Sequence, residues 1–264
     1  MRKTILWALV FVFCLPILVY GASIGGAKTL GQGKFALGVD MDCIFNRDIK
    51  FKSASPALEE GFTLGDNELR NTYRIMGRID YGAVDNIDIY AKLGGSDFES
   101  RGKGYLDGLE VGKEEDDGNA AFAWGVGIKG TYPFENNWLV GLDAEVVFHK
   151  NDYDAAFTPD PTNNPNDSAD TWTGDITITE WQVAPYVAYK MENFTPYVGC
   201  KYSDMLLKYD WTDAWDSNTY KYEADKNFGV FVGLDCEIEK NFVLNIEGRF
   251  IDETAMSVAA RYKF

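Results

Sequence analysis

The sequence is poor in the residues that build disulfide frameworks, metal centres and histidine-based active sites. Its 264 residues include four cysteines and one histidine. Cys43, Cys200 and Cys236 lie beyond the first 22 residues, and this odd number favours small apolar residues on strand faces over a disulfide framework. The cysteines, histidine and carboxylates show no metal-ligand spacing. We therefore expect no metal or other cofactor.

Positive charge is also scarce. Lys and Arg number 25 against 41 Asp and Glu, which gives a formal net charge of −16. Because a nucleic-acid site needs a cationic face, this balance excludes a nucleic-acid-binding protein. Apolar residues make up 46% of the chain and aromatic residues 15%, too many for a disordered acidic chain and typical of β-strands. The composition predicts a folded, β-rich protein.

A long apolar run occurs only at the start of the chain. Arg2 and Lys3 precede the apolar stretch 5–20, and small residues follow at 21–23. This is the plan of a secretory signal peptide, so we assign residues 1–22 to a signal peptide and residues 23–264 to one exported domain. An uncleaved membrane anchor is the alternative, although the stretch is short for a span. No other segment approaches 18 consecutive apolar residues, which excludes a helical membrane protein.

The remaining chain alternates apolar and polar residues with a period of two, the pattern of β-strands. It predicts ten strands over 34–46, 72–82, 87–97, 121–132, 138–149, 177–190, 194–208, 222–238, 242–252 and 255–264. Short links at 83–86, 133–137, 191–193 and 239–241 alternate with long polar links at 47–70, 98–119, 151–175 and 209–221. Antiparallel strands with short turns at one end and long loops at the other predict an all-β, closed up-and-down barrel.

Alternation alone leaves open whether the apolar face is a buried core or a surface in contact with lipid. Aromatic residues stand at both ends of the apolar faces, as Trp138 and Phe148 do, with aliphatic residues between them. Two aromatic girdles are typical of membrane barrels, in which rings lie at the lipid headgroups. The polar faces carry charged residues near mid-strand, interleaved with glycines. We therefore predict a transmembrane barrel with apolar side chains outside; a soluble barrel or sandwich is the alternative.

The charged residues of the polar faces are expected to form a network of ion pairs in the lumen, because buried charges persist when they are paired. Its predicted members are Asp40, Arg74, Arg78, Lys92, Lys129, Asp143, Glu145, Lys201, Asp235, Glu247, Arg249 and Arg261. The alternative concerns two pairs of carboxylates that share a face, Asp143 with Glu145 and Asp40 with Asp42, because paired carboxylates can raise a pKa enough for acid–base chemistry.

The single histidine allows a test for enzymes built on barrels. Outer-membrane phospholipases carry a serine two residues after the histidine, where Asn151 stands here. Omptin-type proteases carry an aspartate two residues before it, where Val147 stands. Neither pattern matches, so we assign no catalytic residue and interpret His149 as a partly solvated residue near a loop.

The predicted loops hold many carboxylates, among them the run from Glu114 to Asp117. Such loops could supply the several oxygens that Ca²⁺ requires, but no complete EF-hand loop occurs. We interpret these carboxylates as parts of solvated acidic loops.

The last strand carries a recognisable pattern. Met256, Val258, Ala260, Tyr262 and Phe264 alternate with more polar residues, and the chain ends on the aromatic residue. This segment resembles the terminal strand of bacterial outer-membrane β-barrels, and 194–199 resembles a strand start of small OmpA-like barrels. The resemblance implies an outer-membrane location, contact with lipid and lipopolysaccharide, and recognition of Ala260, Tyr262 and Phe264 by the barrel-assembly machinery.

Function is less specific in the sequence than architecture. Because about eight strands leave an interior just filled by side chains, ten should leave at most a small conduit. We expect an envelope-stabilising or narrow porin-like protein that passes small solutes and performs no catalysis. The alternative is a surface adhesin or receptor that binds ligands through its acidic loops, and an enzyme at the outer rim is a third reading.

Overall fold

The structure is a computed structural model that describes residues 23–162, 169–212 and 217–264. Within them the chain forms eleven strands: β1 (Phe35–Ser55), β2 (Phe62–Val84), β3 (Ile87–Leu106), β4 (Leu109–Pro133), β5 (Trp138–Pro159), β6 (Asp170–Tyr189), β7 (Phe194–Thr212), β8 (Ser217–Ala224), β9 (Phe228–Glu239), β10 (Phe242–Phe250) and β11 (Thr254–Lys263). A single 3₁₀ turn, η1 (Glu135–Asn137), precedes β5 in this described part. The signal peptide predicted for residues 1–22 lies outside it.

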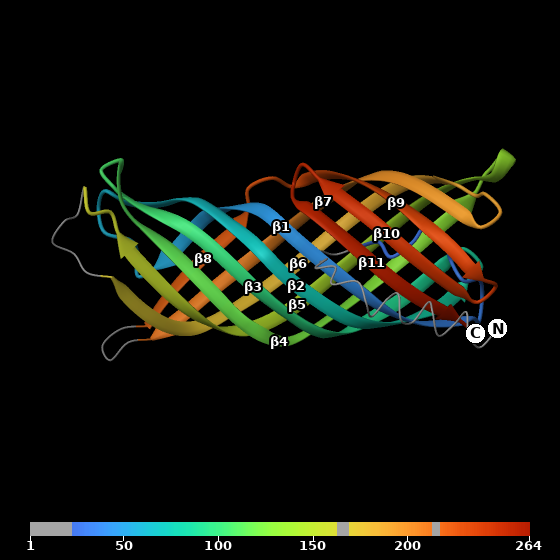
Figure 1. Cartoon of the computed structure of the whole chain (residues 1–264), viewed down its shortest axis with the longest axis horizontal. Helices are drawn as coiled ribbons and strands as arrows, with labels where there is room; N and C mark the ends of the chain where they lie inside the picture. The colour runs from blue at the N-terminus through green and yellow to red at the C-terminus, as the bar shows by residue number, and fades with distance from the viewer. Residues whose placement is uncertain (1–22, 163–168, 213–216) are drawn as a thin grey trace.

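The strands form one elongated barrel (Figure 1), and neighbouring strands are antiparallel. The start of β1 lies beside the C-terminus, where the amide of Phe264 donates to the carbonyl oxygen of Phe35 over 2.9 Å. Among the described residues, no helix has both the length and the apolar character needed to cross a bilayer.

The barrel has ten strands around one end and eight around the other. At the end that holds the C-terminus, β1–β7 and β9–β11 close a ring through the pairing of β1 with β11. Farther along, β7 pairs with β8 from Leu206 onward, and β8 pairs with β1 from Ile49 onward. The short hairpin β10–β11 ends partway along the barrel, as Figure 1 shows, so that β1–β8 alone close the far ring. We refer to these as the ten-stranded part and the eight-stranded part.

In the ten-stranded part, apolar side chains face outward and charged side chains face the lumen. Leu142, Val232 and Ile246 expose 48%, 50% and 44% of their surface, whereas Arg78 and Glu247 expose 1% each. A soluble barrel would have the opposite arrangement. The prediction of apolar residues outside and ionic residues inside is correct for this part.

The eight-stranded part reverses this arrangement. Its interior holds a cluster of buried apolar residues, the upper core: Ile49, Leu69, Phe98, Tyr153, Ala155, Ile176, Ile178, Met205, Leu207, Tyr209, Tyr222 and Ala224. Its outer face is charged, as Lys150, Asp152 and Asp154 on β5 show, all of which are exposed. A charged exterior around an apolar interior is stable in water, whereas the ten-stranded part offers lipid an apolar exterior.

The segments predicted as long loops are largely strand, which corrects the sequence reading. β1 continues to Ser55, β3 and β4 meet at a turn of two residues, and β5 continues to Pro159. The strand predicted over 222–238 is instead divided at 225–227 into β8 and β9.

Irregular pairings explain why the extensions of β1 and β4 escaped detection, whereas β5 keeps its alternation and its outward residues become charged. The register of β1 against β11 shifts between Ile44 and Asn46, and that of β4 against β5 shifts between Gly118 and Ala123. A bulge adds a residue to one strand and so reverses which residues of the alternation face inward. Beyond the bulges the outward residues are also charged, so the sequence shows a broken period followed by a polar stretch and is read as a loop.

Candidate functional site

The lumen of the ten-stranded part is filled with charged side chains. Eleven of the predicted network residues expose 5% or less of their surface: Asp40, Arg74, Arg78, Lys92, Lys129, Asp143, Glu145, Lys201, Asp235, Glu247 and Arg249. The side chain of Arg261 is 11% exposed and lies 3.7 Å from Asp80. The structure thus brings these residues together along the barrel axis.

One group of ion pairs is centred on Lys92. Its Nζ lies 3.1 Å from Asp40 and 2.9 Å from Glu145. The hydroxyl of Tyr90 donates to Asp143 over 2.9 Å, and the guanidinium of Arg78 lies 3.6 Å from the centre of the Tyr90 ring. Asp143 and Glu145 are therefore engaged by cations and a hydroxyl, which is a structural arrangement for paired carboxylates.

A second group lies at the boundary with the eight-stranded part. Arg249 contacts Glu253 at 2.7 Å, and Lys201 contacts Asp252 at 2.9 Å. Glu180 accepts a hydrogen bond from Arg74 at 2.5 Å. These contacts link β2, β6, β7 and β10 across the lumen.

Four members of the second group were missed from the sequence. Arg47, which lies 3.6 Å from Glu253, was in a segment predicted as a loop. Asp252 was the last residue of the predicted strand 242–252, and Glu253 lay in the short link after it. Glu180 stands in a correctly predicted strand, where its alternation with the outward Trp181 marks it as an inward charge. That alternation is a signal that sequence reasoning could have used.

Glycines make room for tyrosines in the lumen. A Cβ atom added to Gly127 would overlap the ring of Tyr90, and one added to Gly141 would overlap the ring of Tyr186. The ring of Tyr197 occupies the same kind of space above Gly233. The glycines interleaved with the charged residues therefore leave space that large polar rings fill, which makes the interior dense.

The segment before β1 also lies inside the ten-stranded part. Ser23, Ile24 and Ala27 expose 1% or less of their surface. Lys129 donates hydrogen bonds to the carbonyl oxygens of Ile24 and Gly26, and the amide of Ala27 donates to Asp235 over 2.9 Å. This lumen segment, residues 23–31, was assigned no role from the sequence, because it contains no strand pattern.

Together these contacts leave little free volume at the boundary between the two parts. A cavity lined by Arg47, Glu145, Glu180 and neighbouring residues has a volume of about 10 Å³, which is roughly the space of one water molecule. The upper core lies beyond it and is apolar. In the described residues the interior is therefore closed first by ion pairs and then by packed apolar side chains.

His149 is placed differently from the sequence prediction. It is 3% exposed, its Nδ1 lies 2.7 Å from the side-chain oxygen of Asn151, and its Nε2 lies 3.7 Å from Glu180. The prediction of partial solvation is wrong because β5 continues ten residues beyond His149, so that the ring faces the closed interior rather than a loop.

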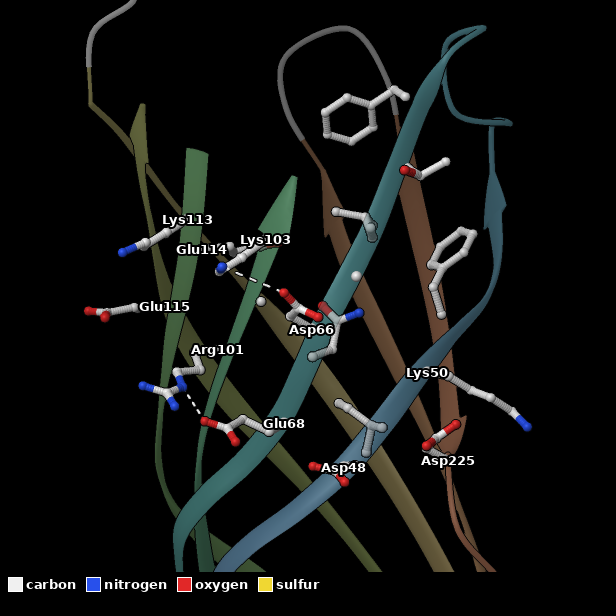
Figure 2. A pocket seen from close by; sticks show the side chains of 18 of the residues that line it. Asp48, Lys50, Asp66, Glu68, Arg101, Lys103, Lys113, Glu114, Glu115 and Asp225 are labelled. Carbon is white, nitrogen blue, oxygen red and sulfur yellow. Dashed lines mark hydrogen bonds and ion pairs between the residues drawn. The ribbon is translucent and has the colours of Figure 1, made fainter. Parts of the chain in front are cut away.

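A wide opening lies in the wall of the eight-stranded part. Pairing between β1 and β2 ends at Ile49 and Asn67, whereas the other edge of β1 stays paired, with β8 following β11. Figure 2 shows β1 and β2 parting at this level. The space between them, which we refer to as the side cavity, has a volume of about 990 Å³. Its lining includes the apolar side chains Phe51, Phe62 and Leu64.

The rim of the side cavity carries charges that are mostly paired. Lys103 lies 3.5 Å from Asp66, and Arg101 pairs with Glu68, as the dashed lines in Figure 2 indicate. Glu114 also lines the cavity, but it has no hydrogen-bond or ion-pair partner among the described residues. Glu114 therefore differs from the charged residues of the rim, most of which are paired.

The carboxylates from Glu114 to Asp117 stand on β4 and not on a solvated loop as predicted. Glu115 and Asp117 are exposed on the outer face, whereas Glu114 and Asp116 face inward. Burial and the nearby Asp116 raise the pKa of Glu114 to about 8. Burial also raises the pKa of Asp116 to about 6, although Ser100 donates a hydrogen bond to it over 2.7 Å. Glu114 and Asp116 therefore lose their protons at a higher pH than ordinary carboxyl groups do.

Comparison with protein families agrees with this architecture. Residues 82–264 match the model of the outer membrane protein β-barrel domain. The chain belongs to this family. Membership implies an outer membrane location, with the ten-stranded part as the section in lipid. No curated protein matches the sequence.

Solved structures of outer membrane barrels are similar in fold to this family member. The outer membrane protease OmpT from Escherichia coli superposes with a TM-score of 0.57 at 14% identity, covering 92% of this chain and 100% of that one. OprG from Pseudomonas aeruginosa gives a TM-score of 0.34 at 12% identity, covering 92% and 99%. The toluene transporter TbuX from Ralstonia pickettii gives 0.39 at 10% identity, covering 88% and 89%. At these identities the likeness to OmpT shows the fold and not the activity.

Proposed function

We propose that the protein is a non-conducting outer membrane barrel that acts as a surface receptor or adhesin through its eight-stranded part. The observation that carries this proposal is the closed lumen, in which the cavity at the boundary has a volume of only about 10 Å³. Of the functions expected from the sequence, this favours surface binding over porin-like passage of small solutes.

The closure is expected to be stable because its charges are paired and buried. Opening a path would separate contacts such as Lys92 with Glu145 at 2.9 Å, and removing one partner of a buried ion pair costs about 3–5 kcal/mol. The lumen segment adds backbone contacts to Lys129 and Asp235. No catalytic role is included, since His149, Asp143 and Glu145 are all engaged in the interior.

The part of the barrel outside the lipid is suited to binding. Except where β1 and β2 part, its strands are paired almost to their tips and surround the upper core, so it is a rigid extension and not a set of loops. The side cavity opens through its wall. Ligands would therefore meet a preformed surface, which reduces the entropy lost on binding.

The outer face of β11 supports the proposed contacts with lipid and with the assembly machinery. Tyr262 is 46% exposed and Phe264 is 67% exposed, and Ala260 lies between Val258 and Tyr262 on the same face. We propose that Ala260, Tyr262 and Phe264 form the segment that the machinery binds during insertion, after which lipid and lipopolysaccharide cover it.

Conductance across a planar lipid bilayer tests the non-conducting state. The full chain, refolded and shown to be a barrel by heat-modifiable gel migration, is expected to produce no stable conductance steps, while a known porin reconstituted in parallel conducts. Regular steps from the refolded chain, absent from a mock reconstitution, would contradict the proposal and favour the porin-like role.

A further inference from the structure

A second cavity lies inside the mouth of the eight-stranded part and is lined mainly by aromatic rings. Its volume is about 220 Å³, and we refer to it as the aromatic cavity. The lining residues are Phe62, Phe157, Trp172, Trp211 and Tyr220, with Leu64, Gly104, Glu114 and Asp170. The rings of Trp172 and Trp211 lie 6.3 Å apart and are tilted by 38°. This arrangement presents several π faces to one small space.

The charge in the aromatic cavity has one sign. Glu114 and Asp170 are its charged lining residues among those described, and neither Lys nor Arg lines it. Asp116, next on the inward face of β4, adds a carboxylate whose Oδ1 is buried and has no hydrogen-bond partner in the described part of the chain. No Lys or Arg neutralises these carboxyl groups locally, so a cation bound beside Glu114 would favour its ionised form and lower its raised pKa.

This chemistry selects among ligand classes. An anion would be repelled by the carboxylates. A metal ion would require more oxygen ligands, and no group of three or more His, Cys, Asp or Glu side chains suited to a metal occurs in the described residues. Aromatic faces with a nearby carboxylate instead attract organic cations, because the ring quadrupole and the negative charge act together on a soft, weakly hydrated cation.

We propose that the aromatic cavity binds a small organic cation, a substituted ammonium ion, with its charge beside Glu114 and its alkyl groups against the surrounding rings. This deepens the proposed receptor function and rests on it. The side cavity shares Phe62, Leu64 and Glu114 with the aromatic cavity, so a ligand can reach Glu114 through the barrel wall. Figure 2 labels Glu114 among the residues that line this opening.

Calorimetric titration of the refolded full chain with choline at about pH 9, where Glu114 is mostly ionised, tests the proposal. Choline is expected to bind saturably, and the neutral alcohol in which carbon replaces its nitrogen should bind at least about tenfold more weakly, because it lacks the charge. Glu114→Gln keeps the size of the side chain and removes its charge, so it is expected to weaken choline binding by about tenfold or more.

Glu115→Gln is the matched control. Glu115 is the next residue on β4, but its side chain is exposed at the outer rim of the side cavity and does not line the aromatic cavity, so this variant should bind choline as the unaltered chain does. Gel migration confirms that each variant is folded.

Three outcomes would overturn the proposal: no saturable binding of choline, equal binding of the neutral alcohol, or unchanged binding by Glu114→Gln. Displacement of choline by Ca²⁺ with tighter binding would also overturn it, in favour of a metal site. A chain that fails to bind choline but remains non-conducting loses this inference alone, whereas a conducting chain loses the proposed function.

Discussion

At the scale of single residues, burial decides which charges matter in this barrel. Glu180 is 6% exposed and is surrounded by Arg74, Arg47 and His149. Glu239 has the same side chain at the end of β9, where it is exposed. Comparing Glu180 with Glu239 separates the contribution of a buried charge network to stability from the contribution of a single exposed charge.

We expect Glu180→Gln to lower the free energy of unfolding by about 3 kcal/mol, because it leaves buried guanidinium groups without their counter-charge. Glu239→Gln should change it by less than about 0.5 kcal/mol. Urea unfolding of the barrel in lipid vesicles, followed by tryptophan fluorescence, measures both. Equal effects of the two variants would show that the lumen charges do not act as a network.

The raised pKa of Glu114 makes the stability of the eight-stranded part depend on pH. The pKa is about 8 in the folded chain against a reference value of 4.5, so the folded state holds this proton more tightly than the unfolded state. Its stabilising contribution is complete below the reference value and is lost as pH rises through about 8. The raised pKa of Asp116, about 6, acts in the same direction at lower pH.

Hydrogen exchange of the backbone amides in 109–118 measures this effect. After correction for intrinsic exchange rates, protection should be roughly tenfold or more lower at about pH 9 than at about pH 5. Glu114→Gln should remove most of this change and Glu115→Gln should retain it. Equal or greater protection at the higher pH would contradict the assignment of a buried, reluctant carboxyl at Glu114.

At the scale of the element, each strand that runs through both parts, β1 to β7, has a different pattern of polar and apolar residues in its two halves. The sequence predicted the lower half of β5 correctly, because Trp138 to Phe148 is a clean apolar alternation that continues in the structure. It did not predict the upper half, where Tyr153 and Ala155 face a core while Asp152 and Asp154 face water. The chemical reversal of inside and outside is set by the solvent around the strand, which local periodicity does not reveal.

The same limit of sequence alternation applies to the candidate site. The lumen charges could be named because they alternate with lipid-facing residues, but Arg47 and Glu114 lie beyond the reversal and were read as loop residues. The aromatic cavity combines rings from β2, β5, β6, β7 and β8. Such a juxtaposition follows from the closure of the barrel and from its register, neither of which sequence alternation specifies.

A pair of arginine substitutions on β5 tests the reversal within one element. Leu142→Arg places a charge at the middle of the apolar outer face and should cost about 2–4 kcal/mol of unfolding free energy in vesicles. Asp152→Arg, on the outer face of the eight-stranded part, should cost less than about 0.5 kcal/mol. Similar costs at both positions would mean that the two residues share one environment.

At the scale of the whole molecule, two differently built barrels share seven continuous strands. The ten-stranded part is apolar outside and ionic inside, and the eight-stranded part is charged outside with the upper core inside. The ending of the hairpin β10–β11 is what changes the strand number. This architecture accounts together for membrane insertion, for closure of the lumen and for a rigid extension into water.

A scan of spin labels along the outer and inner faces of β5, from 138 to 156, tests this account most directly. The account predicts that labels at even positions are accessible to oxygen in the lipid up to 148 and to a water-soluble nickel chelate from 150 onward, while labels at odd positions are accessible to neither. Nickel access to the odd positions, or an even face that stays in one solvent along its whole length, would contradict it.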